Sequence, residues 1–141
     1  MKIALGGDHR GFSLKQFIIE YLSKNHTVID VGCYNFDRCD FPQYAQAVAE
    51  KIQKKEAKKG ILLCGSGIGM SIAANRHKDI YASLVWNEEI ALSSRKHNNA
   101  NVLVLPADFI SEEKIIEILD IWLSTEFLGG TYLDRINLID E

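Results

Sequence analysis

Apolar residues recur along the chain in short runs of strand length. Five such runs are expected to form strands, at residues 2–6, 27–31, 60–64, 81–85 and 101–105. The runs are almost continuously apolar and do not alternate with polar residues, which is typical of strands buried on both faces of a parallel sheet.

Helical patterns lie between the expected strands. Apolar residues at three- and four-residue spacing predict helices at residues 12–23 and 44–54, and further helices are expected at 69–75, 88–96 and 111–123. Ser111 is a suitable N-cap for the last of these, and Glu112 and Glu113 suit its first turn. Strand and helix alternate strictly, so the sequence predicts an α/β fold. The expected form is a single Rossmann-like three-layer sandwich with a five-stranded parallel sheet and right-handed crossovers.

The chain has the length and continuity of one domain. No repeat, low-complexity stretch or Pro/Ser-rich linker divides its 141 residues, so we expect a single domain over residues 1–141. The two prolines, Pro42 and Pro106, are both expected in connections. The tail from about residue 129 to 141 starts at two glycines and then carries several apolar residues, which predicts that it docks on a partner subunit.

The charge balance and the lack of targeting signals limit the classes of binding partner and the location that we expect. The chain has 16 basic and 19 acidic residues and a net charge of -3, and no basic run is longer than the lysine pairs at 54–55 and 58–59. This balance argues against nucleic acid and membrane partners. No apolar leader or membrane span is visible, so the expected location is the cytoplasm.

The cysteines and histidines do not form a ligand pattern. Cys33, Cys39 and Cys64 are an odd set without a CxxC motif, which argues against a disulfide framework and a structural zinc site. Reduced thiols are expected, with Cys33 and Cys39 packed inertly. The histidines are not clustered with carboxylates, so neither a metal nor a cofactor is expected; they are His9, His26, His77 and His97.

The segment that carries most chemical information is residues 61–71, where an apolar strand ends at Cys64 and a glycine loop leads into a helix. Amides at a helix start lack intrahelical acceptors, and the helix dipole adds partial positive charge there, so anions bind at such places. Glycines at 65, 67 and 69 permit close backbone approach. The pattern indicates a nucleophile or base beside an anion hole; a buried cysteine that only ends a core strand is the alternative.

Two other polar groups are candidates for the same site. Residues 7–11 follow the first strand, and residues 95–99 precede the fifth. In an open parallel sheet, ligands bind outside the carboxyl ends of the strands, and we expect both groups there beside Cys64. The first group is also compatible with a plain turn capped by Asp8, and His97 with an ordinary surface imidazole.

Several sharper interpretations of the glycine loop fail on spacing. A dinucleotide fingerprint starting at Gly65 requires a small residue where Met70 stands, and a P-loop requires a GK[ST] sequence that is absent. A cysteine phosphatase would have an arginine at the same position as Met70. The interpretation that remains is metal-free chemistry of a thiol, acting as an acid/base group or as a nucleophile on a small anionic substrate.

Five ordered motifs give the chain a resemblance to a known family. They are Gly7-Asp8-His9-x-Gly11-Phe12-x-Leu14-Lys15, Asp40-Phe41-Pro42-x-Tyr44-Ala45, the Cys64 loop, Arg95-x-His97-Asn98-x-Ala100-Asn101-Val102-Leu103 and Gly129-Gly130-x-x-x-x-Arg135. Together they span residues 2 to about 135. The chain resembles B-type ribose-5-phosphate isomerases, a scaffold shared with allose-6-phosphate and galactose-6-phosphate isomerases.

The resemblance implies a role for each matched residue. Cys64 becomes the base that moves a proton between C1 and C2 of the open-chain sugar, and His97 the acid that helps to open the furanose ring. The residues that contact the substrate are then Asp8, His9, Gly65, Ser66, Gly67, Ile68, Gly69, Asn98 and Arg135. Members of the family are dimers whose sites combine loops of both subunits, so a homodimer or a tetramer is expected to bind the sugar phosphate.

The chain departs from the family at the phosphate end. Asp108 and Thr131 occupy positions where the family usually has arginine, which leaves Arg135 as the one matched phosphate contact. An aspartate near a phosphate repels it. Arg10 is our candidate replacement, with Lys96 as a weaker one, although Arg10 is equally compatible with an exposed charge at a helix start.

Ribose 5-phosphate isomerisation through a cis-enediol is therefore the leading hypothesis. A six-carbon sugar phosphate such as allose 6-phosphate is the nearest alternative, because the phosphate end is altered. The missing arginines also leave open a non-catalytic sugar-phosphate binding protein. A thiol-dependent hydrolase is a more distant alternative, because no His or Asn is tied to Cys64 by local sequence.

Overall fold

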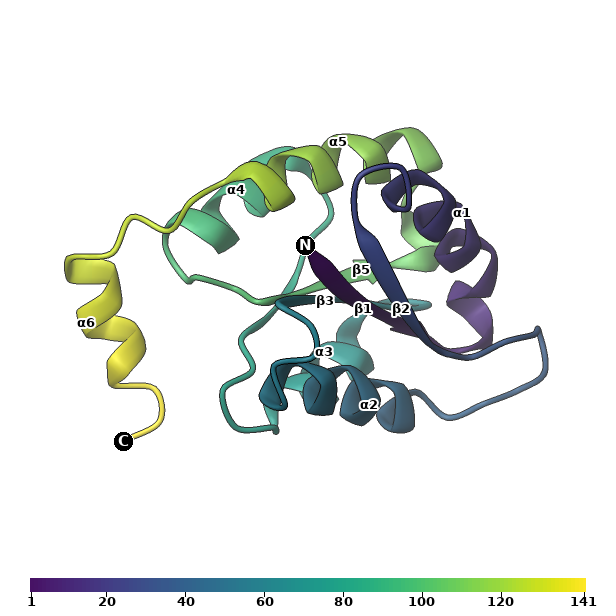
Figure 1. Cartoon of the computed structure of the whole chain (residues 1–141), viewed down its shortest axis with the longest axis horizontal. Coiled ribbons are helices and arrows are strands. Elements are labelled where there is room, and N and C mark those ends of the chain that lie inside the picture. Colours follow the sequence, from purple (N-terminus) through teal and green to yellow (C-terminus); the bar gives the residue numbers. More distant parts are fainter.

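The computed structural model describes residues 1–141 and contains one five-stranded sheet in which all pairings are parallel (Figure 1). Its strands, in the spatial order β2-β1-β3-β5-β4, are β2 (Thr27–Gly32), β1 (Lys2–Gly7), β3 (Lys59–Cys64), β5 (Val102–Pro106) and β4 (Ala82–Leu84). The chain runs from β1 to one edge and then crosses to the other side. The order of strands therefore reverses at β1 and β3, which is where open sheets of this kind bind ligands.

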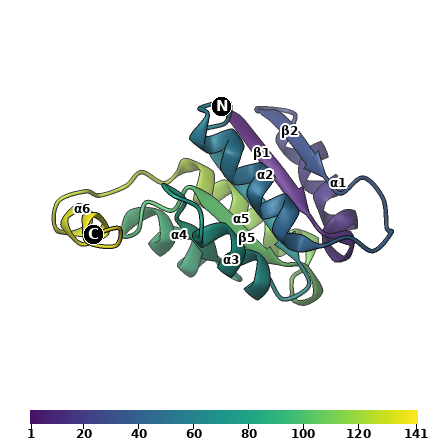
Figure 2. The ribbon, with the colours of Figure 1, turned by 90° about the horizontal axis from the view of Figure 1, so that it is seen from below.

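Helices cover both faces of the sheet (Figures 1 and 2). One face carries α1 (Phe12–Leu22), α4 (Glu88–Lys96) and α5 (Glu112–Ser124), and the other carries α2 (Phe41–Gln53) and α3 (Ile68–Asn75). Short 3₁₀ turns, η1 (His9–Gly11) and η2 (Ala107–Phe109), follow β1 and β5. The last helix, α6 (Thr131–Asn137), stands apart from this body in both views.

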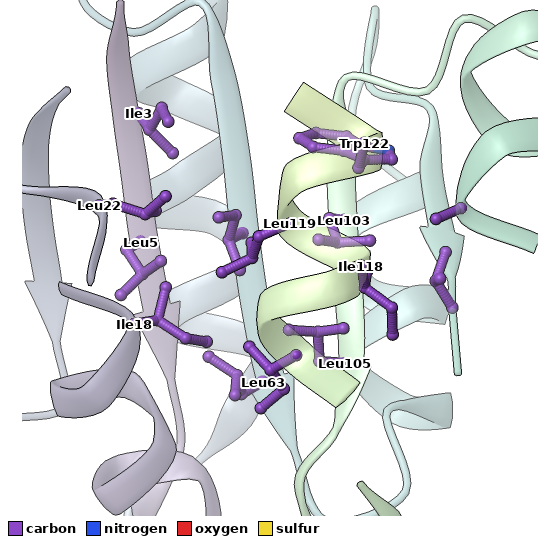
Figure 3. Packing of buried hydrophobic residues seen from close by; sticks show 14 residues of the cluster. Ile3, Leu5, Ile18, Leu22, Leu63, Leu103, Leu105, Ile118, Leu119 and Trp122 are labelled. Atoms are coloured by element: carbon purple, nitrogen blue, oxygen red, sulfur yellow. The ribbon is translucent and has the colours of Figure 1, made fainter. Parts of the chain in front are cut away.

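Alternate residues of the strands belong to two separate hydrophobic cores, one on each face of the sheet. Figure 3 shows the first, in which α1 and α5 pack on strand residues that include Ile3, Leu5, Leu63, Leu103 and Leu105. The intervening residues, among them Ala4, Leu62, Cys64, Val102 and Val104, pack against α2 and α3. This two-sided burial explains the near-continuous apolar runs, because successive side chains of a strand point to opposite faces.

The predicted α/β architecture is confirmed, with differences at some element ends. Helix α2 begins at Phe41 rather than at residue 44, and Pro42 lies in its first turn instead of a connection. Proline fits there because the first-turn amides have no intrahelical acceptor. Strand β4 is shorter than expected, and Pro106 ends β5. The Ser111 cap is confirmed: its side chain accepts a hydrogen bond from the Lys114 amide at 3.2 Å.

The tail contains a helix that periodicity did not predict. Within α6, the Tyr132 ring stacks on His97 with centroids 4.5 Å apart. Beyond α6, the Asp140 carboxylate accepts a hydrogen bond from the Tyr81 hydroxyl at 2.6 Å, and this bond raises the pKa of Tyr81 to about 12. The tail therefore has contacts with its own chain, and its docking on a partner subunit stays a prediction.

The connection from β3 to α3 depends on a left-handed residue. Gly67 has φ of 78°, a conformation that costs a residue with a Cβ about 1–3 kcal/mol. It is also enclosed, because a Cβ at this position would lie 2.4 Å from the Leu84 Cδ1 atom. Glycine is thus favoured here for its backbone freedom, and an added Cβ would also require the end of the Leu84 side chain to shift.

A buried amine lies at the opposite end of β3. Lys59 is only 7% exposed, and its ammonium lies 5.0 Å from the centroid of the Trp122 ring. The Arg95 guanidinium lies 6.0 Å from the same centroid. Burial, reinforced by the charge of Arg95, lowers the pKa of Lys59 to about 8.

Replacing Lys59 by methionine is expected to change how stability depends on pH. Between pH 8 and about 10.5 the unfolded chain binds a proton at Lys59 that the folded chain does not, so this lysine makes the protein more stable as the pH rises. The wild type should gain about 1–3 kcal/mol relative to Lys59→Met across that window. Urea unfolding of both proteins at pH 7.5 and pH 10 measures the change; a constant difference between them would contradict the assignment.

Replacing Gly67 by alanine is expected to lower the free energy of unfolding by about 2–4 kcal/mol, through backbone strain plus steric overlap. Gly129→Ala is the matched control, because Gly129 has φ of 70° but no atom within 4 Å of the added Cβ. The free energy of unfolding of the control should fall only by the contribution of backbone strain. If urea unfolding gave the same loss of unfolding free energy for both variants, the Leu84 side chain would have moved aside without measurable cost.

Candidate active site

Cys64 is the last residue of β3, and its side chain lies on the face covered by α2 and α3. Its Sγ accepts a hydrogen bond from the Gly67 amide at 3.2 Å. Although Cys64 is only 6% exposed, it lines an open cleft of about 350 Å³. The thiol is therefore held by the loop and accessible from a cavity, which favours a chemical role over simple packing.

Some backbone amides of the glycine loop are hydrogen-bonded within the loop, and others remain available at the cleft. The Gly67 amide is used by the Cys64 sulfur, and the Ile68 amide donates to the Ser66 hydroxyl at 3.2 Å. Helix α3 begins at Ile68, so the amides of its first turn have no acceptor within the helix. These amides give the loop its capacity to bind an anion.

Asp8 closes the first loop and also lines the cleft. It is 7% exposed, and its Oδ1 accepts hydrogen bonds from the amides of Arg10 and Gly11 at 3.0 and 3.3 Å. The capped turn that the sequence allowed is thus present. The second carboxylate oxygen, Oδ2, makes no hydrogen bond within the chain, so Asp8 combines a capping role with a free acceptor at the site.

His9 faces the connection between β2 and α2. Its Nδ1 accepts a hydrogen bond from the Cys39 amide at 3.3 Å, which places the proton of a neutral ring on Nε2. Nearby, burial and the adjacent Cys39 thiol raise the pKa of Cys33 to about 11. A thiol with that pKa is protonated near neutral pH, in agreement with inert packing of Cys33.

Arg10 and Asp108 form an ion pair across the cleft, from Nη2 to Oδ2. The pair lies directly above the glycine loop: a Cβ at Gly65 would be 2.8 Å from the Arg10 Nε and 2.8 Å from the Asp108 Oδ2. The Asp108 amide also donates to the Gly65 carbonyl at 2.9 Å. The side chain of Arg10 is therefore part of the site, but its charge already has a partner.

Two aromatic residues that the sequence analysis did not assign to the site complete the lining of the cleft. Phe41 opens α2, and a Cβ at Gly69 would lie 2.8 Å from its ring. Phe109 follows Asp108 in η2 and is 77% exposed. Phe109 follows the carboxyl end of β5. Its place just after an apolar run is the sequence feature from which its position at the cleft could have been predicted.

The expectation that residues 95–99 join Cys64 within the chain is wrong. His97 caps the carboxyl end of α4, and Asn101 hydrogen-bonds Gly60, at the amino end of β3. Since Cys64 pairs with Pro106 at the other end of the same strands, about 13 Å of strand separates the two ends. Residues 95–99 precede β5, and a segment that precedes a strand lies at the amino edge of a parallel sheet.

The other predicted residues also lie away from Cys64. Asn98 lines a different pocket of about 330 Å³, together with Tyr81 and Asp140. Arg135 belongs to α6, where its guanidinium lies 5.8 Å from the centroid of the Tyr132 ring. One chain thus brings together Asp8, Arg10 and the loop of Cys64, but it does not add His97, Asn98 or Arg135 to them.

No three of the His, Cys, Asp and Glu side chains lie close enough together to hold a metal ion. None of the helices has both the length and the apolar character needed to cross a bilayer.

Comparisons with known proteins agree with one another. A family model described as Ribose/Galactose Isomerase matches residues 3–139. The chain is 40% identical over 139 residues to the ribose-5-phosphate isomerase B of Escherichia coli, covering 98% of this chain and 93% of that protein.

Solved structures match over nearly the whole chain. A ribose 5-phosphate isomerase from Thermotoga maritima superposes with a TM-score of 0.97 at 47% identity, covering 99% of this chain and 97% of the other. A ribose-5-phosphate isomerase B from Mycoplasma genitalium, solved with bound ribulose-5-phosphate, gives a TM-score of 0.94 at 40% identity, with coverage of 98% and 93%. The chain therefore belongs to the ribose/galactose isomerase family.

Proposed function

We propose that this protein is an aldose-ketose isomerase that interconverts ribose 5-phosphate and ribulose 5-phosphate. The observation that carries the proposal is the Cys64 sulfur, which lines an open cleft beside Asp8 and Arg10 and is held by a loop amide. Relatives named ribose-5-phosphate isomerase B and a related structure with bound ribulose-5-phosphate support this substrate.

Cys64 is the base in this proposal. As a thiolate it removes the proton from C2 of the open-chain aldose and returns a proton to C1, while the hydroxyl proton of O2 passes to O1, so the carbonyl moves from C1 to C2. The negative charge that develops on the substrate oxygen has backbone donors available in the loop at Gly65–Gly69, apart from the Gly67 and Ile68 amides, which are engaged within the loop. Donors that are fixed before the reaction stabilise such an enediolate without reorganisation. No metal ion or cofactor enters this route.

Other residues of the same chain orient the sugar. Asp8 has a free carboxylate oxygen that can accept a hydrogen bond from a sugar hydroxyl, and Ser66 offers a hydroxyl at the cleft. Through these contacts the substrate is positioned with its C1–C2 end at the sulfur. Positioning of this kind is a large part of catalysis, because it replaces the entropy cost of bringing reactants together.

The acid that opens the furanose ring comes, in this proposal, from a second copy of the chain. His97 lies at the opposite end of the sheet from Cys64 in its own subunit, so it cannot serve its own thiol. A homodimer in which each cleft receives His97 and Asn98 of the other copy would complete both sites. Exposed apolar residues on α3 and in the tail, including Ile68, Ile72, Leu133 and Leu138, supply surface for such an assembly.

The phosphate is held in part by Arg135 of that second copy. Arg10 is the cation that the cleft's own subunit contributes, and the resemblance to the family implies that Asp108 and Thr131 stand where its members usually have arginine. The same substitutions support a second candidate, a six-carbon sugar phosphate such as allose 6-phosphate, whose phosphate would sit differently. The ratio of kcat/KM for the two sugars decides between them.

A non-catalytic sugar-phosphate binding protein is the alternative of a different class. It would bind ribose 5-phosphate saturably, yet deuterium from the solvent would not enter C2 of the sugar. Incorporation of deuterium at C2, measured by NMR, would exclude it.

Purified protein should convert ribose 5-phosphate to ketose in the presence of EDTA, and Cys64→Ala should reduce kcat by at least about 10²-fold, because the base is lost. Cys33→Ala is the matched control, since it removes a buried thiol that does not line the cleft. Retention of activity by Cys64→Ala would show that Cys64 is not the base.

A mixture of two inactive variants tests whether the sites are shared. Cys64→Ala and His97→Ala are each expected to be inactive, but after joint unfolding and refolding the mixed dimers contain one site with both residues intact. About a quarter of all sites should then be active. Co-refolded protein that stays inactive, while co-refolded wild type recovers, would contradict shared sites.

A further inference from the structure

The Arg10–Asp108 ion pair has no role in the proton transfer proposed above. It lies at the mouth of the cleft, where the Arg10 side chain is 59% exposed and that of Asp108 is 34% exposed. The two residues are 98 positions apart and come from the turns after β1 and β5. Exposed ion pairs contribute little to stability, so the fold alone gives no reason for this one.

Arg10 is the only cationic side chain that lines the cleft. The other charged lining residues are Asp8 and Asp108, so the cleft's own subunit presents two carboxylates and one guanidinium. A phosphate ester that enters this half of the site has Arg10 as its one cation. Asp108 already holds that guanidinium.

The backbone of Asp108 is held beside the glycine loop. Its backbone is tied to the glycine loop by the hydrogen bond from the Asp108 amide to the Gly65 carbonyl, at 2.9 Å. Even with Arg10 engaged by a ligand, the short Asp108 side chain would therefore keep its negative charge within the cleft that it lines. A bound phosphate must compete with it for Arg10 and also bear its repulsion.

We propose that Asp108 occupies Arg10 as an internal counter-ion and thereby weakens phosphate binding at this cleft. This inference rests on the proposed function, because it takes the phosphate of the sugar as the ligand of Arg10. Asp108 acts through Arg10 and does not touch the reacting carbons. The consequence is that a single neutral substitution should tighten binding.

Asp108→Asn keeps the shape of the side chain and removes its charge. The KM for ribose 5-phosphate and the inhibition constant of inorganic phosphate should both fall at least about fivefold, with the change in KM rather than kcat. Calorimetric titration with inorganic phosphate should show the same gain without any turnover. Asp108→Ser, which is also neutral, should behave alike, and thermal melting of each variant checks its folding.

The gain should depend on Arg10. Arg10→Ala should cost more phosphate affinity in the Asp108→Asn protein than in the wild type, because in the wild type the guanidinium is already engaged. Asp37→Asn is the matched control: it removes the same charge from an exposed loop residue outside the cleft and should leave both constants unchanged.

Unchanged or weakened phosphate binding in both Asp108 variants would overturn the inference; weakened binding would mean that Asp108 orients Arg10 for the ligand. A gain that persists without Arg10 would overturn it as well. These outcomes are distinct from failure of the proposed function, which would show as a wild type that makes no ketose. Calorimetry with inorganic phosphate still decides the role of Asp108 in that case.

Discussion

The parallel pairing of β1, β3 and β5 is the constraint on which the candidate site depends. Gly7 is paired with Leu63, and Cys64 with Pro106, so three strands end at the same level. Whatever follows each strand must emerge beside the others, and this brings together Asp8, the Cys64 loop and Asp108. The chemistry thus follows from register: a shift of β3 by one residue would turn the sulfur toward the opposite core.

Local pattern was enough to predict the strand, loop and helix at the centre of the candidate site. The apolar run before Cys64, the glycines after it and the helix that follows are contiguous in sequence, and each has a direct structural meaning. The same is true of the fold, because strands buried on both faces and strict alternation with helices leave few other arrangements. The start of α2 was missed because Phe41 and Pro42 precede the periodic apolar positions that mark the helix.

The remaining features depend on distant parts of the chain. His97 was assigned to the wrong edge because its residue types were considered without the direction of α4, which returns the chain to the amino ends of the strands. The Arg10–Asp108 pair joins the turns after two different strands, and no periodicity or motif links such positions. Helix α6 has only 7 residues and follows two glycines, so it offers few positions at which a helical period could be recognised.

In the proposed dimer, the charges in the cleft would link substrate binding to assembly. One subunit presents Asp8, Arg10 and Asp108, which together carry no excess of positive charge, so a single cleft has little net attraction for a phosphate dianion. In the proposed dimer, the missing attraction comes from Arg135 of the other copy, as does the ring-opening acid His97. Binding and catalysis would then both need the second subunit, and a separated monomer would retain the thiol and its loop without the groups that bring a sugar phosphate to them.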